Sequence, residues 1–296
     1  MQSCSLAASR LAMQWADEMD YMARALQLAS RALGTCSPNP AVGAVIVRDG
    51  QIVGEGATQP PGEAHAEVVA LRNAGPLARG GTLYVTLEPC AHFGRTPPCA
   101  DALVQAGIAE AHVAMRDPSP WVNGHGIGAL EQAGIRVQQG SHEQAARRLN
   151  EAYLCWLERG RPLVTALYAL GLDGRVSALA VASLDEAARS ELARLRAMAD
   201  RTVQAVDGLL AEDPGLTALA ANGITALHVE APPTALDALV GRSLLDKVVV
   251  FVTPTLGGSD PPGTRPTDLR ALRSVSYERL GSTLMVTGYL AGGRTE

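Results

Sequence analysis

Residues 82–99 read TLYVTLEPCAHFGRTPPC, and this stretch carries the clearest structural signal in the chain. Its first six residues form a largely apolar run, which predicts a buried strand. The strand is followed by Pro89-Cys90, and a second cysteine, Cys99, lies at the start of a segment with helical spacing. A strand followed closely by a helix is typical of an α/β layer.

Helices and strands alternate on both sides of this stretch, which predicts a complete α/β layer. Asp49-Gly50 is a turn signal between two short apolar runs and therefore predicts a hairpin. The spacing of apolar residues predicts helices over 17–34, 64–74, 98–106, 126–133 and 142–159, and strands over 41–47, 51–53, 82–87, 111–115 and 135–138.

The pattern breaks at Gly160-Arg161-Pro162, which we interpret as a domain boundary. We expect a flexible N-terminus over 1–16, a first domain over 17–160 and a second α/β domain over 161–296. The second domain is expected to hold strands from 163 and near 202–206, 225–230, 247–252, 273–278 and 283–290, a helix over 185–199 and an exposed loop over 257–267.

Charge and cysteine content narrow the class of protein. The 296-residue chain has a net charge of −5 and no dense basic stripe, which argues against a nucleic-acid partner and favours a small-molecule substrate. Residues 1–22 hold no apolar run long enough for a membrane span or a signal peptide. Five cysteines, an odd number, argue against a disulfide framework. We therefore expect a cytoplasmic protein that does not bind membranes.

His65, Cys90 and Cys99 form the set of residues that carries the chemistry. One imidazole and two thiolates are three ligands for a tetrahedral zinc ion, and a fourth position left to water makes such a site catalytic. Zinc makes hydroxide available at neutral pH. Glu67 lies two residues after the histidine, at a helix start, where it could carry protons from water to the leaving amine. This combination predicts a zinc-dependent hydrolytic deaminase.

The loop between the two cysteines is longer than the common deaminase spacing of Pro-Cys-x-x-Cys. Eight residues separate Cys90 from Cys99, and they place His92, Arg95 and Thr96 beside the metal. An arginine side chain can donate two parallel hydrogen bonds to a phosphate. The loop therefore predicts recognition of an anionic group on the substrate.

Two other interpretations of these residues stay open. His65 and the cysteines could each be ordinary buried core residues, as isolated residues of these types usually are. The zinc site could also be closed and structural, with Cys36 supplying a fourth ligand from a distant turn.

The segments 37–43, 65–67 and 88–99, with Asp117-Pro118, resemble the bifunctional pyrimidine deaminase/reductase family of riboflavin biosynthesis. The resemblance covers most of residues 17–160. It implies a cytidine-deaminase-like α/β/α sandwich followed by a truncated α/β domain like dihydrofolate reductase and the riboflavin reductases. It also implies one zinc ion per chain and a substrate of the 2,5-diamino-6-ribosylamino-4(3H)-pyrimidinone 5′-phosphate type.

The same resemblance implies roles for individual substrate-binding residues. Asn39 would contact the pyrimidine and Arg95 the phosphate, while His92, Asp117 and Ser119 would line the ribose side. Asn39 lies between two prolines and could also form a simple turn. The family usually has His at the position of Thr58 and Asn at the position of Ser119, which suggests an altered pocket.

Residues from 161 onward resemble the reductase domain of that family but depart from it where cofactor and substrate would bind. Leu167 replaces a lysine, Gly171 replaces a serine, and Ala218-Leu219 stand where an arginine is expected. Glu230-Ala231-Pro232 replaces a Glu-Gly-Gly turn, and a Pro ring there would obstruct the approach of a dinucleotide. Few residues separate Thr217 from the strand expected over 225–230, so we expect a helix and a strand of the family's nucleotide-binding sheet to be missing there. We expect a degenerate reductase domain that does not bind NADPH.

The expected function is deamination of a phosphorylated pyrimidine, either in riboflavin synthesis or in a related azapteridine pathway of the toxoflavin type. A complete bifunctional deaminase/NADPH reductase and a non-catalytic zinc-stabilised scaffold are the alternatives. Exposed apolar strands in the second domain favour a homodimer.

Overall fold

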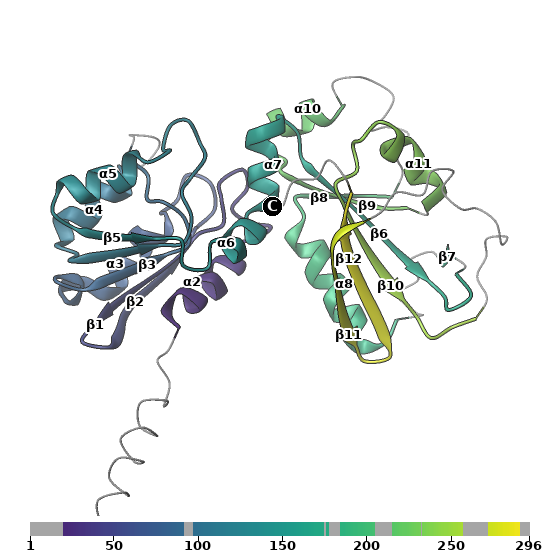
Figure 1. Cartoon of the computed structure of the whole chain (residues 1–296), viewed down its shortest axis with the longest axis horizontal. Coiled ribbons are helices and arrows are strands. Elements are labelled where there is room, and N and C mark those ends of the chain that lie inside the picture. The colour runs from purple at the N-terminus through teal and green to yellow at the C-terminus, as the bar shows by residue number, and fades with distance from the viewer. Residues whose placement is uncertain are drawn as a thin grey trace, which may run out of the picture.

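The computed structural model describes residues 20–91, 97–174, 176–177, 184–204, 215–231, 233–256 and 272–290. Two β-sheets lie in separate halves of the molecule, and helix α7 (Glu151–Arg159) lies between them (Figure 1). This arrangement confirms the predicted α/β class with two layered halves. The predicted boundary at residues 160–162 falls between α7 and the first strand of the second sheet.

The first sheet has five strands in the order β2-β1-β3-β4-β5. The predicted hairpin is confirmed, because β1 and β2 pair antiparallel around Asp49 and Gly50, which both have positive φ. β3, β4 and β5 are parallel to one another. The strands are β1 (Gly43–Arg48), β2 (Gln51–Ala57), β3 (Thr82–Val85), β4 (Glu110–Val113) and β5 (Arg136–Gln139).

Helices cover both faces of this sheet. Helix α2 packs so closely on one face that a Cβ at Gly43 would clash with the carbonyl oxygen of Ala25, and α3 packs equally closely on the other face at Gly56. Glycine at these two strand positions therefore permits the α/β/α sandwich. The helices are α2 (Tyr21–Ser30), α3 (Ala66–Ala74), η1 (Gly75–Ala78), α4 (Cys99–Ala106), α5 (His125–Gln132) and α6 (Glu143–Leu149).

The long helix predicted over 142–159 is wrong, because the chain forms two helices, α6 and α7, separated at Asn150. The buried Asn150 side chain accepts a hydrogen bond from the Ala41 amide (2.8 Å) and donates one to the Ala41 carbonyl (3.0 Å). These bonds tie the helix break to the segment that enters β1. A single polar side chain therefore overrides the helical spacing of the apolar residues.

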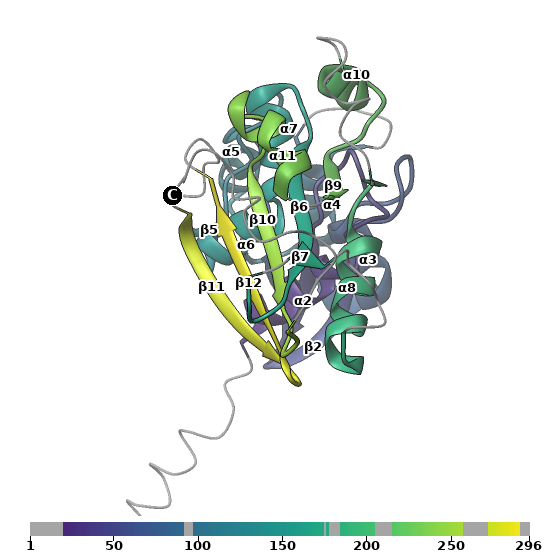
Figure 2. The ribbon, with the colours of Figure 1, turned by 90° about the vertical axis from the view of Figure 1, so that its right-hand side faces the viewer.

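The second sheet has the order β11-β12-β10-β6-β9-β8, with β7 paired to β6. β6, β8, β9 and β10 are parallel, and the β11–β12 hairpin lies at one edge (Figure 2). Its strands are β6 (Leu163–Leu170), β7 (Val176–Ser177), β8 (Arg201–Val203), β9 (Ala226–Glu230), β10 (Lys247–Val252), β11 (Arg273–Leu280) and β12 (Thr283–Tyr289).

Each face of the second sheet has its own apolar core. Leu192 of α8 (Glu186–Met198) packs with Leu167 and Phe251 on one face, and Leu239 of α11 (Pro233–Gly241) packs with Leu227 on the other. The predicted helix over 185–199 and the strand over 247–252 are confirmed. Neither α11 nor α10 (Gly215–Ala221) was predicted from the sequence.

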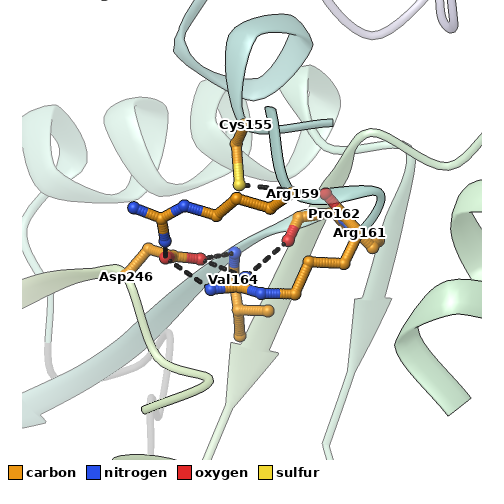
Figure 3. A network of polar contacts seen from close by, with 6 residues as sticks. All are labelled: Cys155, Arg159, Arg161, Pro162, Val164 and Asp246. Atoms are coloured by element: carbon orange, nitrogen blue, oxygen red, sulfur yellow. Dashed lines mark hydrogen bonds and ion pairs between the residues drawn. The ribbon is translucent and has the colours of Figure 1, made fainter. Parts of the chain in front are cut away.

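An ion-pair network fixes the connection between the two halves (Figure 3). Asp246, whose side chain is 1% exposed, accepts hydrogen bonds from Arg159 (2.6 Å) and from both terminal nitrogens of Arg161 (2.7 and 2.9 Å). The Val164 amide donates to the same carboxylate (2.9 Å). The end of α7, the connection and the start of β10 therefore meet at one buried charge.

The remaining sequence predictions differ at element ends or fall on residues that are not described. Helix α2 ends at Ser30, so Gly34 does not close it. The N-terminal segment 1–19, residues 205–206 of the strand predicted over 202–206, and the loop predicted over 257–267 lie outside the described residues. Among the described residues, no helix has the length and apolar character that a membrane span requires.

Candidate metal and substrate site

The carboxyl ends of β3 and β4 and the start of β1 meet at one edge of the first sheet, because β3 and β4 are parallel and β1 runs opposite to β3. Segments that leave or enter these strands converge there, as ligand-binding segments do in open α/β sheets. They bring together three residues with metal-binding side chains: His65 just before α3, Cys90 after β3, and Cys99 at the start of α4.

The three side chains are close enough to share one metal ion. The Nδ1 atom of His65 lies 3.6 Å from the Cys90 Sγ and 3.3 Å from the Cys99 Sγ, and all three donor atoms lie within 4.8 Å of one another. Nitrogen and sulfur ligands of a tetrahedral zinc ion are separated by about 3.6 Å. The donor set and its spacing therefore fit zinc.

Hydrogen bonds already favour a thiolate at Cys90. The Cys99 side chain and the Cys99 amide (3.3 Å) both donate to the Cys90 sulfur, and with His65 they lower the pKa of Cys90 to about 4. The hydrogen bond to Cys90 also raises the pKa of His65. The same pairing, with burial, raises the pKa of Cys99.

Glu67 lies in the first turn of α3 with only 3% of its surface exposed. Burial, together with the negative charge of Cys90, raises the pKa of Glu67 to about 7. Its carboxyl group also interacts with the Cys99 side chain. His65 directly precedes α3, whereas Glu67 lies in its first turn. The buried Glu67 carboxyl group thus lies beside the donor cluster without belonging to it, and it can exchange protons with a molecule bound there.

A cavity of about 460 Å³ opens beside this cluster. Its volume is in the range of pockets for small molecules. The lining residues that were predicted from the sequence are Asn39, Thr58, His65, Glu67, Cys90, Asp117 and Ser119. His65 and Cys90 of the donor cluster, Glu67 and four of the seven predicted substrate residues therefore line one cavity, and Cys99 lies buried behind them.

Glu88 organises one wall of the cavity. Its buried carboxylate accepts hydrogen bonds from the backbone amides of Asp117, Gly124, Gly126 and Ile127, at 3.0 to 3.3 Å. A Cβ at Gly126 would clash with the Pro89 carbonyl oxygen. The segment after β4 can therefore fold closely over the Cys90 segment.

Asp117 and Ser119 lie on this wall, and both are buried. The Asp117 carboxylate accepts hydrogen bonds from the Ser119 amide (2.9 Å) and from the Tyr153 hydroxyl (3.2 Å). Burial beside that carboxylate raises the pKa of Tyr153. Helix α7 thus contributes to the same wall.

Thr58, just after β2, and Asn39, shortly before β1, also line the cavity. The Thr58 hydroxyl accepts a hydrogen bond from the Val42 amide (3.0 Å) and donates one to the Pro40 carbonyl (3.1 Å). Thr58 therefore holds the segment around Asn39 in place.

Three predicted substrate residues, His92, Arg95 and Thr96, lie outside the described residues. Cys36, considered above as a fourth metal ligand, is buried in a separate cluster with Ala32 and Ala41. Within the described part of the chain, the group of possible metal ligands consists of His65, Cys90 and Cys99. This finding does not support a closed site completed by Cys36.

Sequence reasoning missed three aromatic residues of the cavity: Trp121, which is 74% exposed, and Tyr153 and Trp156 of α7. Tyr153 and Trp156 are three residues apart, a spacing that places both on one face of a helix. That spacing could have marked an aromatic wall, but only tertiary structure reveals that α7 lies against the cavity.

Comparison with known protein families supports the zinc-binding part of the site. The model of the cytidine and deoxycytidylate deaminase zinc-binding region matches residues 15–115. The riboflavin biosynthesis protein RibD of Escherichia coli is 48% identical over 200 residues, 67% of this chain and 54% of that protein. RibD of Mycobacterium tuberculosis is 43% identical over 232 residues, 75% of this chain and 66% of that protein. The chain thus spans about half the length of the E. coli protein.

Solved structures extend the similarity to both sheets. Acinetobacter baumannii RibD, form 1, has a TM-score of 0.77 and 30% identity, with 91% of this chain and 98% of that chain covered. A Thermotoga maritima protein, described as a diaminohydroxyphosphoribosylaminopyrimidine deaminase/5-amino-6-(5-phosphoribosylamino)uracil reductase, has a TM-score of 0.78 at 24% identity, with 91% and 97% covered. These similarities confirm the fold predicted for the two halves.

Proposed function

The chain belongs to the bifunctional riboflavin-biosynthesis pyrimidine deaminase/reductase family, and from this premise we propose that it hydrolytically deaminates a phosphorylated diaminopyrimidine. The observation that carries the proposal is the cluster of His65, Cys90 and Cys99, which lies at a cavity lined by His65, Cys90 and the buried Glu67. The substrate class follows from the family, as a pyrimidinone with a ribosylamino 5′-phosphate group.

In the proposed reaction, water adds to the ring carbon that bears the amine, the carbon–nitrogen bond breaks, and ammonia leaves. His65, Cys90 and Cys99 would hold zinc, which supplies Lewis acidity that lowers the pKa of water to about 7. Glu67 takes one proton from the attacking water and passes it to the ring nitrogen, and it then carries the second proton from the new hydroxyl group to the amine, which leaves as ammonia. The walls around Asp117 and Asn39 orient the substrate and exclude bulk water.

The deaminase proposal is tested by changing Glu67→Gln, which keeps the shape of the side chain but removes the proton carrier. We expect ammonia release from the phosphorylated diaminopyrimidinone to fall by a factor of about 10² to 10⁴, with bound zinc unchanged. Glu131→Gln, at an exposed position on α5, is the matched control. Full activity of the Glu67→Gln protein would rule out the assigned role, and absence of ammonia with wild-type protein would rule out the substrate.

We propose further that the second domain has lost reductase activity. Leu167, at the position where the family has a lysine, is fully buried in the apolar core under α8, so it offers no cation to a phosphorylated ligand. Glu230 at the end of β9 is held by Arg196 of α8 through two hydrogen bonds (2.5 and 2.7 Å). Pro232, which follows this strand, lies outside the described residues.

NADPH binding is the measurement that tests this loss. Titration of the full chain with NADPH, followed by the fluorescence of the nicotinamide, is expected to give no saturable signal at micromolar concentrations. Saturable binding would contradict the loss and favour the complete bifunctional enzyme.

A deaminase without a reductase could serve riboflavin synthesis beside a separate reductase. It also suits a pathway that uses deaminated pyrimidines without forming a ribityl chain, as the toxoflavin type does. The combination of a complete donor cluster with Leu167 and Ala231 in the second domain favours these monofunctional roles.

A further inference from the structure

Residues of the second domain hold two segments of the first domain that line the cavity. The first segment is residues 37–40, whose Pro38, Asn39 and Pro40 face the cavity. The Ser37 hydroxyl lies 3.2 Å from the hydroxyl of Thr225, just before β9 in the second domain. The second segment is α7, which contributes Trp156.

The contact between Ser37 and Thr225 has a defined direction. The Thr225 hydroxyl donates its single proton to Asp200 (2.9 Å), so Ser37 is the donor toward Thr225. The same Asp200 oxygen accepts the backbone amides of Thr225 (2.7 Å) and Ala226 (2.9 Å). Asp200 therefore fixes the position of Thr225, and Thr225 fixes Ser37.

Close packing supports this chain of hydrogen bonds. Gly223 lies against the Pro38 ring, since a Cβ at Gly223 would lie 3.5 Å from the Pro38 Cδ. Just before this segment in the chain, a Cβ at Gly34 would clash with the carbonyl oxygen of Ala197 in α8. The loop that carries Asn39 therefore runs directly between the cavity and the second domain.

Trp156 makes the second connection. Its indole Nε1 donates a hydrogen bond to the carbonyl of Ala220 in α10 (3.2 Å). The ring centroid of Trp156 lies 6.4 Å from that of Tyr153, whose hydroxyl donates to Asp117. The second domain thus supports both the Asn39 side and the Asp117 side of the cavity.

We propose that the second domain is a positioning element of the deaminase site, in which Thr225 acts through Ser37 and Ala220 acts through Trp156. This inference rests on the proposed deaminase function. One contact holds Ser37, which directly precedes the cavity-lining Pro38, and the other holds Trp156, which lines the cavity; neither touches the donor cluster. They therefore set the affinity for the substrate rather than the rate of the chemical step.

The test uses the full zinc-loaded chain with Ser37→Ala, Thr225→Val and the double variant. Each single change removes a hydrogen bond that positions the Asn39 loop, so KM is expected to rise about three- to tenfold, with kcat within about twofold of wild type. The double variant is expected to match Thr225→Val, because both changes break the same contact. Thr202→Val, at an exposed position on β8, is the control and leaves both constants unchanged.

Binding of the deaminated product, followed by the fluorescence of Trp121 and Trp156, gives a readout that requires no turnover. The dissociation constant is expected to rise by the same factor as KM. Unchanged KM and binding in all three variants, or additive effects in the double variant, would overturn the positioning role. If the wild-type protein binds the product but releases no ammonia, the proposed function is contradicted. The binding measurements on the variants would then decide the positioning role by themselves.

Discussion

At the scale of single residues, the environment of Glu67 and Cys90 separates this site from an ordinary protein core. The buried carboxyl group of Glu67, in the first turn of α3, lies beside the buried thiol of Cys99, at the start of α4, and the half-buried thiol of Cys90. Such a cluster is stable when a cation compensates its negative charge. We therefore expect metal binding to stabilise the positions of His65 and the cysteines.

Changing Cys99→Ser tests this dependence. Serine is a poor zinc ligand, so we expect the metal content to fall from about one zinc ion per chain to a small fraction, and thermal stability to fall with it. Elemental analysis of the purified full chain measures this. Cys155→Ser, a buried cysteine outside the cluster, serves as the control and should keep its zinc. Equal zinc in both variants would exclude Cys99 as a ligand.

The donor residues could be predicted from the sequence because their types and their positions after a strand and before two helices are locally encoded. The roles of Tyr153 and Trp156 could not, since aromatic residues at helical spacing are most often core residues. Their position at the cavity depends on where α7 lies, and that is set by Asn150 and by the second domain.

At the scale of secondary-structure elements, Asn150 decides where α6 ends and α7 begins. Its side chain satisfies both backbone groups of Ala41, and it also bonds to the Ala146 carbonyl (3.4 Å). The helix break is therefore a contact between two distant segments. Apolar periodicity is insensitive to such a contact, which explains why the sequence predicted one continuous helix.

We predict that Asn150→Ala lowers the free energy of unfolding by about 2 to 4 kcal/mol, because it leaves the buried amide and carbonyl of Ala41 without partners. Denaturant unfolding of the full chain measures the loss. Asn73→Ala, which removes an exposed hydrogen bond to the Glu55 carbonyl, should cost less than about 1 kcal/mol. Similar losses in the two variants would contradict the assigned role of Asn150.

His228 on β9 gives the second sheet a pH-dependent stability. Its Nδ1 atom is buried without a hydrogen-bond partner among the described residues. Burial and the nearby Lys247 lower the pKa of His228 from 6.5 to about 4, although Glu230 and Asp200 oppose the shift. The folded protein therefore resists protonation at a pH where the unfolded chain already accepts the proton.

Stability should accordingly be complete above about pH 6.5 and decline as the pH falls toward 4, because the unfolded state binds one more proton in that window. Urea unfolding of wild type and His228→Leu across this range tests it. The variant should show a shallower decline, while His125→Leu, an exposed histidine, should follow wild type. A decline of equal steepness in the His228→Leu protein would contradict the assignment.

At the scale of the whole molecule, the two halves are joined by more than a linker. Arg159 and Arg161 meet at Asp246, and Glu151 of α7 accepts hydrogen bonds from Lys247 (2.5 Å) and Tyr289 (2.6 Å) of the second sheet. The sequence predicts a break at Gly160–Pro162 from its glycine and proline. The charged contacts across it come from residues far apart in the sequence, so no local pattern could reveal them.

This joined architecture supports the proposed positioning role of the second domain, a role that requires no reaction of its own. Thr225 contacts Ser37, next to the cavity-lining Pro38, and the Ala220 carbonyl accepts a hydrogen bond from the cavity-lining Trp156. Leu167 of the second domain, in contrast, lies buried in an apolar core. We therefore expect a single active site in the molecule, formed by His65, Cys90, Cys99 and Glu67.

One reaction tests this most directly: the zinc-loaded chain is supplied with the phosphorylated diaminopyrimidinone and NADPH together, and ammonia and NADPH absorbance are followed at the same time. We predict release of about one ammonia per substrate molecule with no loss of NADPH. If no ammonia is released, the proposed deaminase activity is contradicted. If NADPH is oxidised at the rate at which ammonia is released, the claim of a single active site is contradicted.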